Sequence, residues 1–160
     1  MEELEYISVL QQLDEYLDNK HLKRTEERHM VLKVICTFKS HFDVNMLYDQ
    51  LQAVHFTVSR ATIYNTLELL INAGVIIRHP LHGGLRQYEL CQLAANHTHL
   101  VCTRCGCIRE LGMETQAIDL PALRKIRFTP THQCLYIYGL CHKCKQQKKA
   151  EAVKAINKRV

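Results

Sequence analysis

The sequence lacks the two features that would place it in or across a membrane. A spanning helix needs roughly 20 consecutive apolar residues, and no uncharged apolar run approaches that length in these 160 residues. The first six residues, MEELEY, are acidic and lack the basic and then apolar order of a secretory signal peptide. We therefore expect a cytoplasmic protein with no membrane partner.

An intracellular setting does not favour a disulfide framework, so we interpret the eight cysteines as metal ligands or redox groups. The sequence also lacks an evident pattern of nucleophile, general base and substrate pocket. An enzyme that uses a His, Glu and Cys zinc site with a bound water is therefore the least favoured class. We expect no enzymatic activity and no small organic substrate.

Positive charge is segregated along the chain. Residues 141–160 hold seven basic residues and one acid, which exceeds the net charge of +5 for the whole chain. A second basic segment, with Lys20, Lys23 and Arg24, follows an acidic N-terminal stretch. Basic segments of this kind fit contact with nucleic acid, whereas a solvated helix end explains the C-terminal tail equally well.

Apolar side chains recur every three or four positions in the first half, which is typical of amphipathic helices. The expected helices cover residues 3–18, 25–38, 43–54 and 59–73. Thr25, Asp43 and Ser59 are suited to cap three of them through their side-chain oxygens. Gly74 is suited to end the last one, because glycine readily adopts the left-handed conformation of a helix C-terminus.

After Gly74 the pattern changes to two strands, residues 75–78 and 85–91, around a turn at His82-Gly83-Gly84. Helix, short loop, helix and hairpin is the order of a winged helix-turn-helix. We assign residues 1–84 to such a DNA-binding domain and residues 85–160 to a second domain that ends in the basic tail. The predicted fold class is α+β.

The helix at 59–73 would enter the major groove of double-stranded DNA. Asparagine pairs bidentately with adenine, and tyrosine contacts phosphate or a thymine methyl group. The same exposed side chains also occur on helices that bind nothing, so periodicity alone leaves both readings open. The candidate DNA contacts are Arg60, Thr62, Tyr64, Asn65, Lys20, Lys23 and Arg24.

Two C-x-x-C pairs give the strongest signal of the second half. Cys102 and Cys105 form one pair, and Cys141 and Cys144 form the other. A two-residue gap lets one tight turn present two thiolates to an ion, and a structural Zn²⁺ takes four ligands in a tetrahedron. Redox dithiols are the alternative, which is disfavoured because no catalytic group or βαβ unit accompanies either pair. We expect a structural zinc.

A second group of metal-binding residue types precedes the first pair. His97 and His99 point to the same face if the segment is a strand, and Glu89 and Cys91 would likewise share a face of the preceding strand. A mixed set of nitrogen, oxygen and sulfur ligands suits a divalent transition metal. A site drawn from separate elements can order the hinge between them, as a switch requires.

The motifs together resemble the ferric uptake regulator (Fur) superfamily of metal-responsive bacterial repressors, over roughly residues 22–145. The segments that carry the resemblance are RATIYNTL (60–67), AGVI (73–76), YEL (88–90), HTHLVCTRCG (97–106), LYIYG (135–139) and the second cysteine pair. The resemblance implies an N-terminal winged-helix domain, a C-terminal α/β dimerisation domain and a homodimer bound to a palindromic operator. It also implies that metal at the domain junction locks the DNA-binding domains in the arrangement that fits the operator.

The resemblance implies two metal sites. The four paired cysteines match the structural zinc site of the family. The regulatory site matches His41, Glu89, His97, His99 and Glu110. Tyr64 falls on the DNA-contacting tyrosine, whereas Asn65 replaces an arginine found in many members, so we expect a different operator preference.

The regulatory metal stays open between Fe²⁺, Mn²⁺ and Zn²⁺. Glu89 and His97 are one residue further apart than in the iron-sensing pattern, which lets Cys91 compete as a ligand. A Cys91 ligand would favour zinc, whereas a Cys91 side chain in the core would favour iron.

We expect a repressor of iron uptake first, and a zinc uptake or peroxide-responsive regulator next. A constitutive DNA-binding protein with purely structural zinc is the alternative from another class. The remaining histidines, including His79, are expected to be surface or packing residues. Cys36 and Cys134, in apolar runs, are expected in the core. Cys107 is expected in the core or in a strand, with a spare thiol beside the paired cysteines as the alternative.

Overall fold

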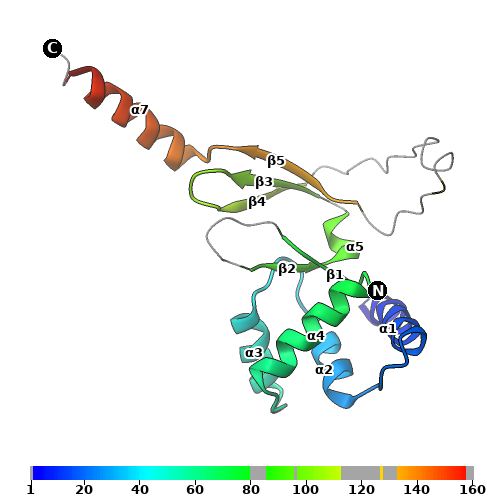
Figure 1. Cartoon of the computed structure of the whole chain (residues 1–160). Helices are drawn as coiled ribbons and strands as arrows, with labels where there is room; N and C mark the ends of the chain where they lie inside the picture. Colours follow the sequence, from blue (N-terminus) through cyan, green and yellow to red (C-terminus); the bar gives the residue numbers. More distant parts are fainter. Residues whose placement is uncertain (1, 80–85, 96, 113–126, 128–132, 158–160) are drawn as a thin grey trace.

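The computed structural model describes residues 2–79, 86–95, 97–112, 127 and 133–157, and Figure 1 shows the path of the chain. The described elements are α1 (Glu2–Asn19), α2 (Glu26–Ile35), α3 (Val44–Ala53), α4 (Arg60–Asn72), β1 (Ile76–Arg78), β2 (Tyr88–Leu90), α5 (Cys91–Ala94), β3 (Thr98–Cys102), β4 (Ile108–Leu111), β5 (Leu135–Gly139) and α7 (His142–Asn157). The predicted α+β class is confirmed. Among the described residues, no helix is both long and apolar enough to span a membrane.

The three predicted N-caps are confirmed. The side-chain oxygens of Thr25 and Ser59 each accept a hydrogen bond from a backbone N–H in the first turn of α2 and α4. The Asp43 carboxylate accepts two at the start of α3. Gly74 has a φ of +71° directly after the last turn of α4, as expected of a residue at that position.

Helix α2 ends at Ile35, three residues before the predicted end. The next backbone bonds join Thr37 to Val34 and Phe38 to Ile35, so the chain tightens into turns. The Thr37 hydroxyl also donates to the Val34 carbonyl, which competes with continuation of the helix. The buried faces of α1 to α4 nevertheless form one hydrophobic core with residues of β1 and β2.

The wing is an antiparallel pair of β1 and β2, in which Ile77 lies opposite Glu89. Phe42, between α2 and α3, exchanges two backbone hydrogen bonds with Tyr88 and thereby joins the far side of β2. The predicted turn at residues 82–84 falls outside the described residues. The two backbone hydrogen bonds between Phe42 and Tyr88 hold the segment before α3 beside the wing.

The predicted strand through Cys91 was wrong at its end. Strand β2 stops at Leu90, and Cys91 begins the short helix α5. One helical turn places Cys91 and Ala94 on the same face, where both are buried against Ile77. A continued strand would have turned alternate side chains away from that cluster.

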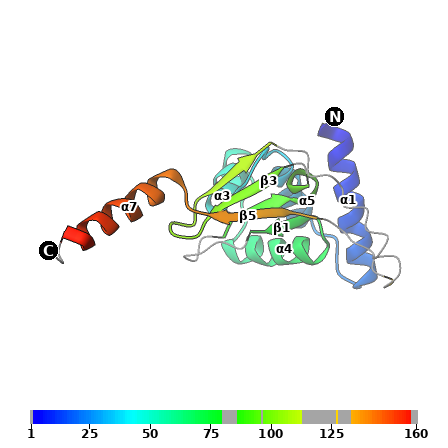
Figure 2. The same ribbon diagram turned by 90° about the horizontal axis from the view of Figure 1, so that it is seen from above.

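The second sheet has the order β4-β3-β5, with β3 antiparallel to β4 and parallel to β5. It lies over the wing, and α5 connects the two sheets (Figure 1). Helix α7 extends from the end of β5 away from the rest of the molecule, and Figure 2 shows it at the opposite end from α1. Within the described part of the chain, β5 is an edge strand.

Candidate metal centres

Four imidazoles and one carboxylate converge between the wing and the second sheet. We name this group the imidazole cluster; its members are His41, His79, Glu89, His97 and His99. The Nε2 atom of His99 lies 3.0 Å from Nε2 of His41, 3.1 Å from Nε2 of His97 and 3.2 Å from Oε2 of Glu89. Ligand atoms of these four residues all lie within 4.8 Å of one another.

The fold assembles this cluster from separate elements. His41 is brought in because the next residue, Phe42, pairs with Tyr88, the neighbour of Glu89 on β2. His97 and His99 flank the first residue of β3 and point to one side, as the two-residue period predicts. Four of the five residues that the resemblance implies for the regulatory site, His41, Glu89, His97 and His99, therefore lie together, and their ligand roles stay a prediction.

His79 also belongs to the cluster, and its predicted role as a surface or packing residue was incomplete. Its ring is 2% exposed, and Nε2 lies 3.3 Å from Oε2 of Glu89. The ring also packs edge-on against His41, with centroids 4.4 Å apart. In the register of the wing, His79 lies diagonal to Glu89 on the same face, within reach of a long side chain. That register is the signal that could have revealed it.

The carboxylate of Glu89 is fully buried, which is costly for a charge without partners. Burial raises its pKa, but the close imidazoles of His41, His79 and His99 outweigh that effect and hold the pKa below its usual value. Burial lowers the pKa of His99, but its contacts with Cys134 and Glu89 dominate and raise it to about 9. Glu89 and His99 thus stabilise each other's charged forms.

The cluster fits a divalent cation. Among the described buried side chains, only Nε2 of His79 and Oε1 of Glu89 have no hydrogen-bond partner, and both belong to this group. Burial lowers the pKa of His79, so this ring is held in the neutral form that ligates metals. A cation between the nitrogens and the carboxylate would satisfy both atoms.

Three outer contacts orient the rings. Glu110, which lies opposite His99 across β3 and β4, places Oε1 3.1 Å from Nδ1 of His41. Cys134 places its sulfur 3.2 Å from Nδ1 of His99. The Tyr136 hydroxyl lies 3.0 Å from Nδ1 of His79. Partners on the remote ring nitrogen fix the orientation of metal-binding histidines. Glu110 occupies this position beside His41, and its expected role as a ligand stays a prediction.

Cys91 does not join the ligand atoms of the cluster. Its side chain is buried with Ile77 and Ala94, and Cys134 packs against the same group. Burial, followed by the nearby Cys134 and Glu89, raises the pKa of the Cys91 thiol to about 11. Because metals bind the thiolate, this environment favours a small apolar packing role for Cys91.

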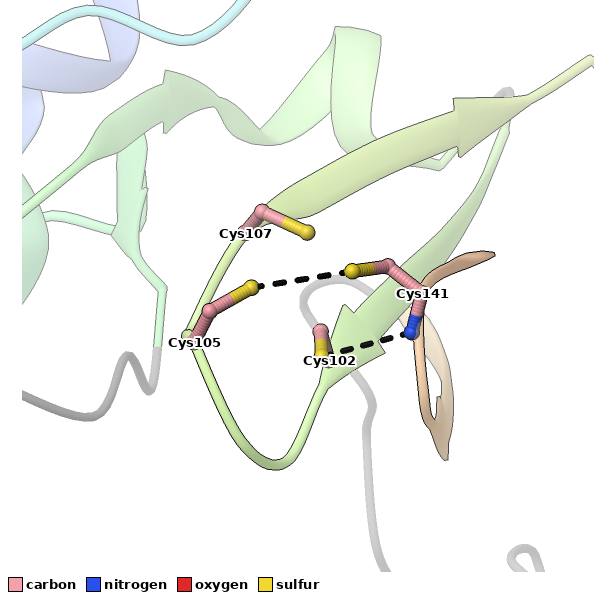
Figure 3. Close-up of side chains that lie close together, drawn as sticks. All are labelled: Cys102, Cys105, Cys107 and Cys141. Atoms are coloured by element: carbon pink, nitrogen blue, oxygen red, sulfur yellow. Dashed lines mark hydrogen bonds between the residues drawn. The ribbon is translucent and has the colours of Figure 1, made fainter. Parts of the chain in front are cut away.

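The paired cysteines meet at one end of the second sheet, together with Cys107. We name these five residues the thiol cluster: Cys102, Cys105, Cys107, Cys141 and Cys144. The sulfurs of Cys102, Cys105, Cys107 and Cys141 lie within 4.8 Å of one another (Figure 3). Burial and the nearby thiols of Cys105, Cys141 and Cys102 raise the pKa of Cys144, which lies in the first turn of α7. The four predicted zinc ligands are therefore close together.

Backbone N–H groups prepare this cluster for a cation. Hydrogen bonds from the backbone of Cys141, Cys105 and Arg104 lower the pKa of Cys102 to about 5, and the bond from Cys141 N is 3.3 Å long. Cys107 is half-buried and points toward Cys105 and Cys141 (Figure 3). Cys107 lies directly before β4 beside the paired cysteines, as in the alternative of a spare thiol and not in the core or a strand, because the turn at Gly106 returns it to them.

The candidate DNA contacts lie at the end of the molecule away from α7 (Figure 1). Tyr64 and Asn65 are exposed on α4, and Arg60 lies at its start. The Arg60 guanidinium donates to the Asn45 side chain and stacks over the Tyr48 ring, which anchors it to α3. The lysines at 20 and 23 are exposed in the connection between α1 and α2.

Two of the candidate DNA contacts, Arg24 and Thr62, are less free to contact DNA than the other candidates. Arg24 forms ion pairs with Asp14 and Asp18 on α1, which offset part of its charge. Thr62 is half-buried, and its hydroxyl lies 2.8 Å from that of the cap residue Ser59. The exposed Tyr64 and Asn65 remain the side chains best placed to reach a partner.

Comparison with known proteins agrees with this arrangement. A model described as the ferric uptake regulator family matches residues 19–138. The ferric uptake regulation protein of Campylobacter upsaliensis is 29% identical over 156 residues, which cover 94% of this chain and 98% of the relative.

Solved structures give the same picture. The ferric uptake regulator from Pseudomonas aeruginosa with manganese is 25% identical with a TM-score of 0.61, over 81% of this chain and 97% of that one. The regulator from Francisella tularensis with iron is 27% identical with a TM-score of 0.52, over 78% and 95%. Since the family match spans both sheets and every member of the imidazole cluster, the chain belongs to the ferric uptake regulator family of DNA-binding, metal-responsive transcription regulators, which are not enzymes.

Proposed function

We propose that this chain is a metal-dependent transcriptional repressor that controls iron uptake. The observation that carries the proposal is the imidazole cluster, because its ligands come from both units. His41, His79 and Glu89 belong to the winged unit, whereas His97 and His99 belong to the second sheet. Residues that hold one ion from two units also hold the units against each other.

The roles of the residues follow from their contacts. The paired cysteines would hold a structural zinc that fixes the end of the second sheet. His41, Glu89, His97 and His99, with His79, would hold the regulatory ion, and Glu110 would orient His41. When bound, that ion supplies positive charge and fixed coordination geometry at the junction.

The proposed partner is a palindromic operator in double-stranded DNA, bound by a homodimer. Helix α4 would enter the major groove, with Tyr64 and Asn65 reading bases, Arg60 and Thr62 beside them, and Lys20, Lys23 and Arg24 near phosphates. The edge strand β5 supports the dimer, because Ile137 and Tyr138 are about half exposed on it. A partner that covers β5 would place two α4 helices on one duplex.

The division into domains is also a proposal. The sequence-based boundary lies between residues 84 and 85. Strand β2 pairs with β1, and its Tyr88 and Leu90 pack in the core of α1 to α4. We therefore include residues 86–90 in the winged unit, while the described residues between 97 and 157 form the second unit.

Iron is the proposed metal because Cys91 packs in the core and the cluster is left with nitrogen and oxygen ligands. Relatives and structural neighbours named ferric uptake regulators support the same choice. Zinc is the second candidate, and His79 is the observation that favours it. A fourth imidazole suits zinc, and the general affinity order places Zn²⁺ above Fe²⁺ and Mn²⁺.

The test is operator binding as a function of metal. A duplex would be selected from random-sequence DNA with iron-loaded protein, and its affinity would be measured anaerobically with Fe²⁺, Mn²⁺, Zn²⁺ or a chelator at fixed salt. We expect a gain of about 5- to 150-fold on metal loading, as is typical of allosteric coupling. Affinity unchanged by chelator, with structural zinc retained, would instead support a constitutive DNA-binding protein.

A further inference from the structure

The thiol cluster contains one more sulfur than a tetrahedral zinc can bind. Structural zinc takes four ligands, whereas five cysteines gather at this end of the second sheet. The C-x-x-C pattern alone selects Cys102, Cys105, Cys141 and Cys144. The geometry brings a different fourth member, Cys107, within 4.8 Å of three of them.

The turn between β3 and β4 explains the position of Cys107. Gly106 has a φ of +71°, and its N–H donates to the Cys102 carbonyl at 2.9 Å. The Cys102 N–H in turn donates to the Cys107 carbonyl at 2.9 Å, which closes the turn. A glycine allows this reversal at low conformational cost. The Cys107 sulfur consequently returns to face Cys105 and Cys141 (Figure 3).

Cys107 and Cys144 approach the same thiols from different elements. Cys107 is half-buried directly before β4, and Cys144 is buried in the first turn of α7. The Cys107 sulfur lies within 4.8 Å of those of Cys105 and Cys141, and Cys144 follows Cys141 by three residues, at the start of α7. The sulfurs of Cys102, Cys105 and Cys141 are therefore common to both possible sets of four, and only the fourth position differs.

We propose that Cys107 is an exchangeable fifth ligand of the structural zinc, which competes with Cys144 for the fourth position. In the exchange, the bond from zinc to the Cys107 sulfur forms as the bond to the Cys144 sulfur breaks. The proton released by the Cys107 thiol is taken up by Cys144, so charge and electron count are unchanged. This inference rests on the structural zinc of the proposed function and is independent of the regulatory metal.

The exchange has a consequence for α7. Its first turn is held to the sheet by Cys144 and by Arg104, which donates to the Cys144 carbonyl and pairs with Glu151. With Cys107 in the fourth position, the zinc no longer fixes α7 through Cys144. The sheet keeps its zinc in both arrangements, while the attachment of the basic helix changes.

The experiment compares full-length Cys107→Ser, Cys144→Ser and the double variant, with Cys36→Ser as a matched control outside the cluster. Zinc per chain is measured after dialysis against a chelator, and the ligand set is read from the sulfur-to-metal charge-transfer absorption after Co²⁺ substitution. We expect about one zinc per chain and four-thiolate absorption in both single variants. The double variant keeps three thiolates of the set, so it should lose zinc or lose the quarter of the charge-transfer absorption that one thiolate contributes.

Each other result overturns the exchange. Loss of zinc or of one thiolate in Cys144→Ser, with Cys107→Ser unchanged, would make Cys107 a bystander. The converse would make Cys107 the fixed ligand, and loss in both single variants would exclude replacement. Wild-type protein without any zinc would contradict the structural zinc of the proposed function. That result can be told apart from a failure of the ligand exchange alone, in which the wild-type protein still holds zinc.

Alkylation of zinc-loaded wild-type protein gives a second readout that needs no variant. Partial labelling of both Cys107 and Cys144, with Cys102, Cys105 and Cys141 protected, supports the exchange. Full labelling of Cys107 with complete protection of Cys144 contradicts it.

Discussion

The two candidate metal centres of this chain differ in the origin of their residues. The thiol cluster is contained in one sheet end, formed by the turn between β3 and β4 and by the start of α7. The imidazole cluster combines the wing, the connection before α3 and the start of β3. A site within one unit can stabilise that unit only, whereas a site shared by two units can change how they sit together. Under the proposed function, a metal held by thiolates would thus stabilise one unit, and a metal held by nitrogen and oxygen ligands would act as the switch between the two.

The largest effect should come from the double variant Cys102→Ser/Cys105→Ser, because it leaves three sulfurs in the thiol cluster, one fewer than a structural zinc needs. Structural zinc supplies about 10 kcal/mol or more of folding free energy in small zinc domains, which is comparable to the whole stability of an ordinary domain. We expect loss of zinc and of hydrogen-exchange protection in residues 98–111, while α2 to α4 stay protected. Cys36→Ser should leave both unchanged. Retained zinc would contradict the assignment.

His99→Ala should have the opposite pattern. His99 lies at the centre of the imidazole cluster and is the only described residue there that contacts His41, His97 and Glu89 together. We expect the structural zinc to stay and the affinity for a second metal to fall by more than about 100-fold, since even outer-sphere changes cost 10- to 100-fold. Titration with Mn²⁺ would measure this. His29→Ala, paired with Asp14 far from the cluster, is the control. Loss of zinc in His99→Ala would mean that the two centres are not separable.

The comparison also explains what the sequence could and could not predict. The helix caps and the C-x-x-C pairs depend on residues within a few positions of one another, and the structure places them as expected. His97 and His99 follow from the two-residue period of a strand. These features are local, so no knowledge of the tertiary fold is needed.

The errors share a different cause. His79 meets Glu89 only in the particular register of β1 and β2, which sequence spacing across residues 80–85 does not determine. Cys91 was placed beside Glu89 by strand alternation, but the burial of Cys91 and Ala94 turns the chain into α5. Cys107 depends on the turn at Gly106. In each case, tertiary packing decided the direction of a side chain that a period of two left open.

His79→Ala and His79→Gln test whether this ring is a ligand or only fills space. Glutamine retains volume and a hydrogen-bonding group near Tyr136, so a packing role predicts a mild effect for Gln alone. A ligand role predicts that both variants lose about 10- to 100-fold in Zn²⁺ affinity and less in Mn²⁺ affinity, because imidazole suits zinc better than manganese. Competition with a fluorescent chelator would measure both metals. Equal affinity in Gln and wild type would remove His79 from the ligand set.

The smallest effect should come from Tyr136→Phe, which removes only the hydroxyl 3.0 Å from Nδ1 of His79. The ring of Tyr136 also stacks on His99 at 5.0 Å, and phenylalanine keeps that contact. We expect a loss of about tenfold or less in Zn²⁺ affinity, with Tyr138→Phe, on the exposed part of β5, as the control. Because the hydroxyl acts through His79, the same change should add nothing in a His79→Ala background. An undiminished effect there would show that Tyr136 acts through His99 instead, and the edge strand β5 would then be linked to the cluster by its ring and not by its hydroxyl.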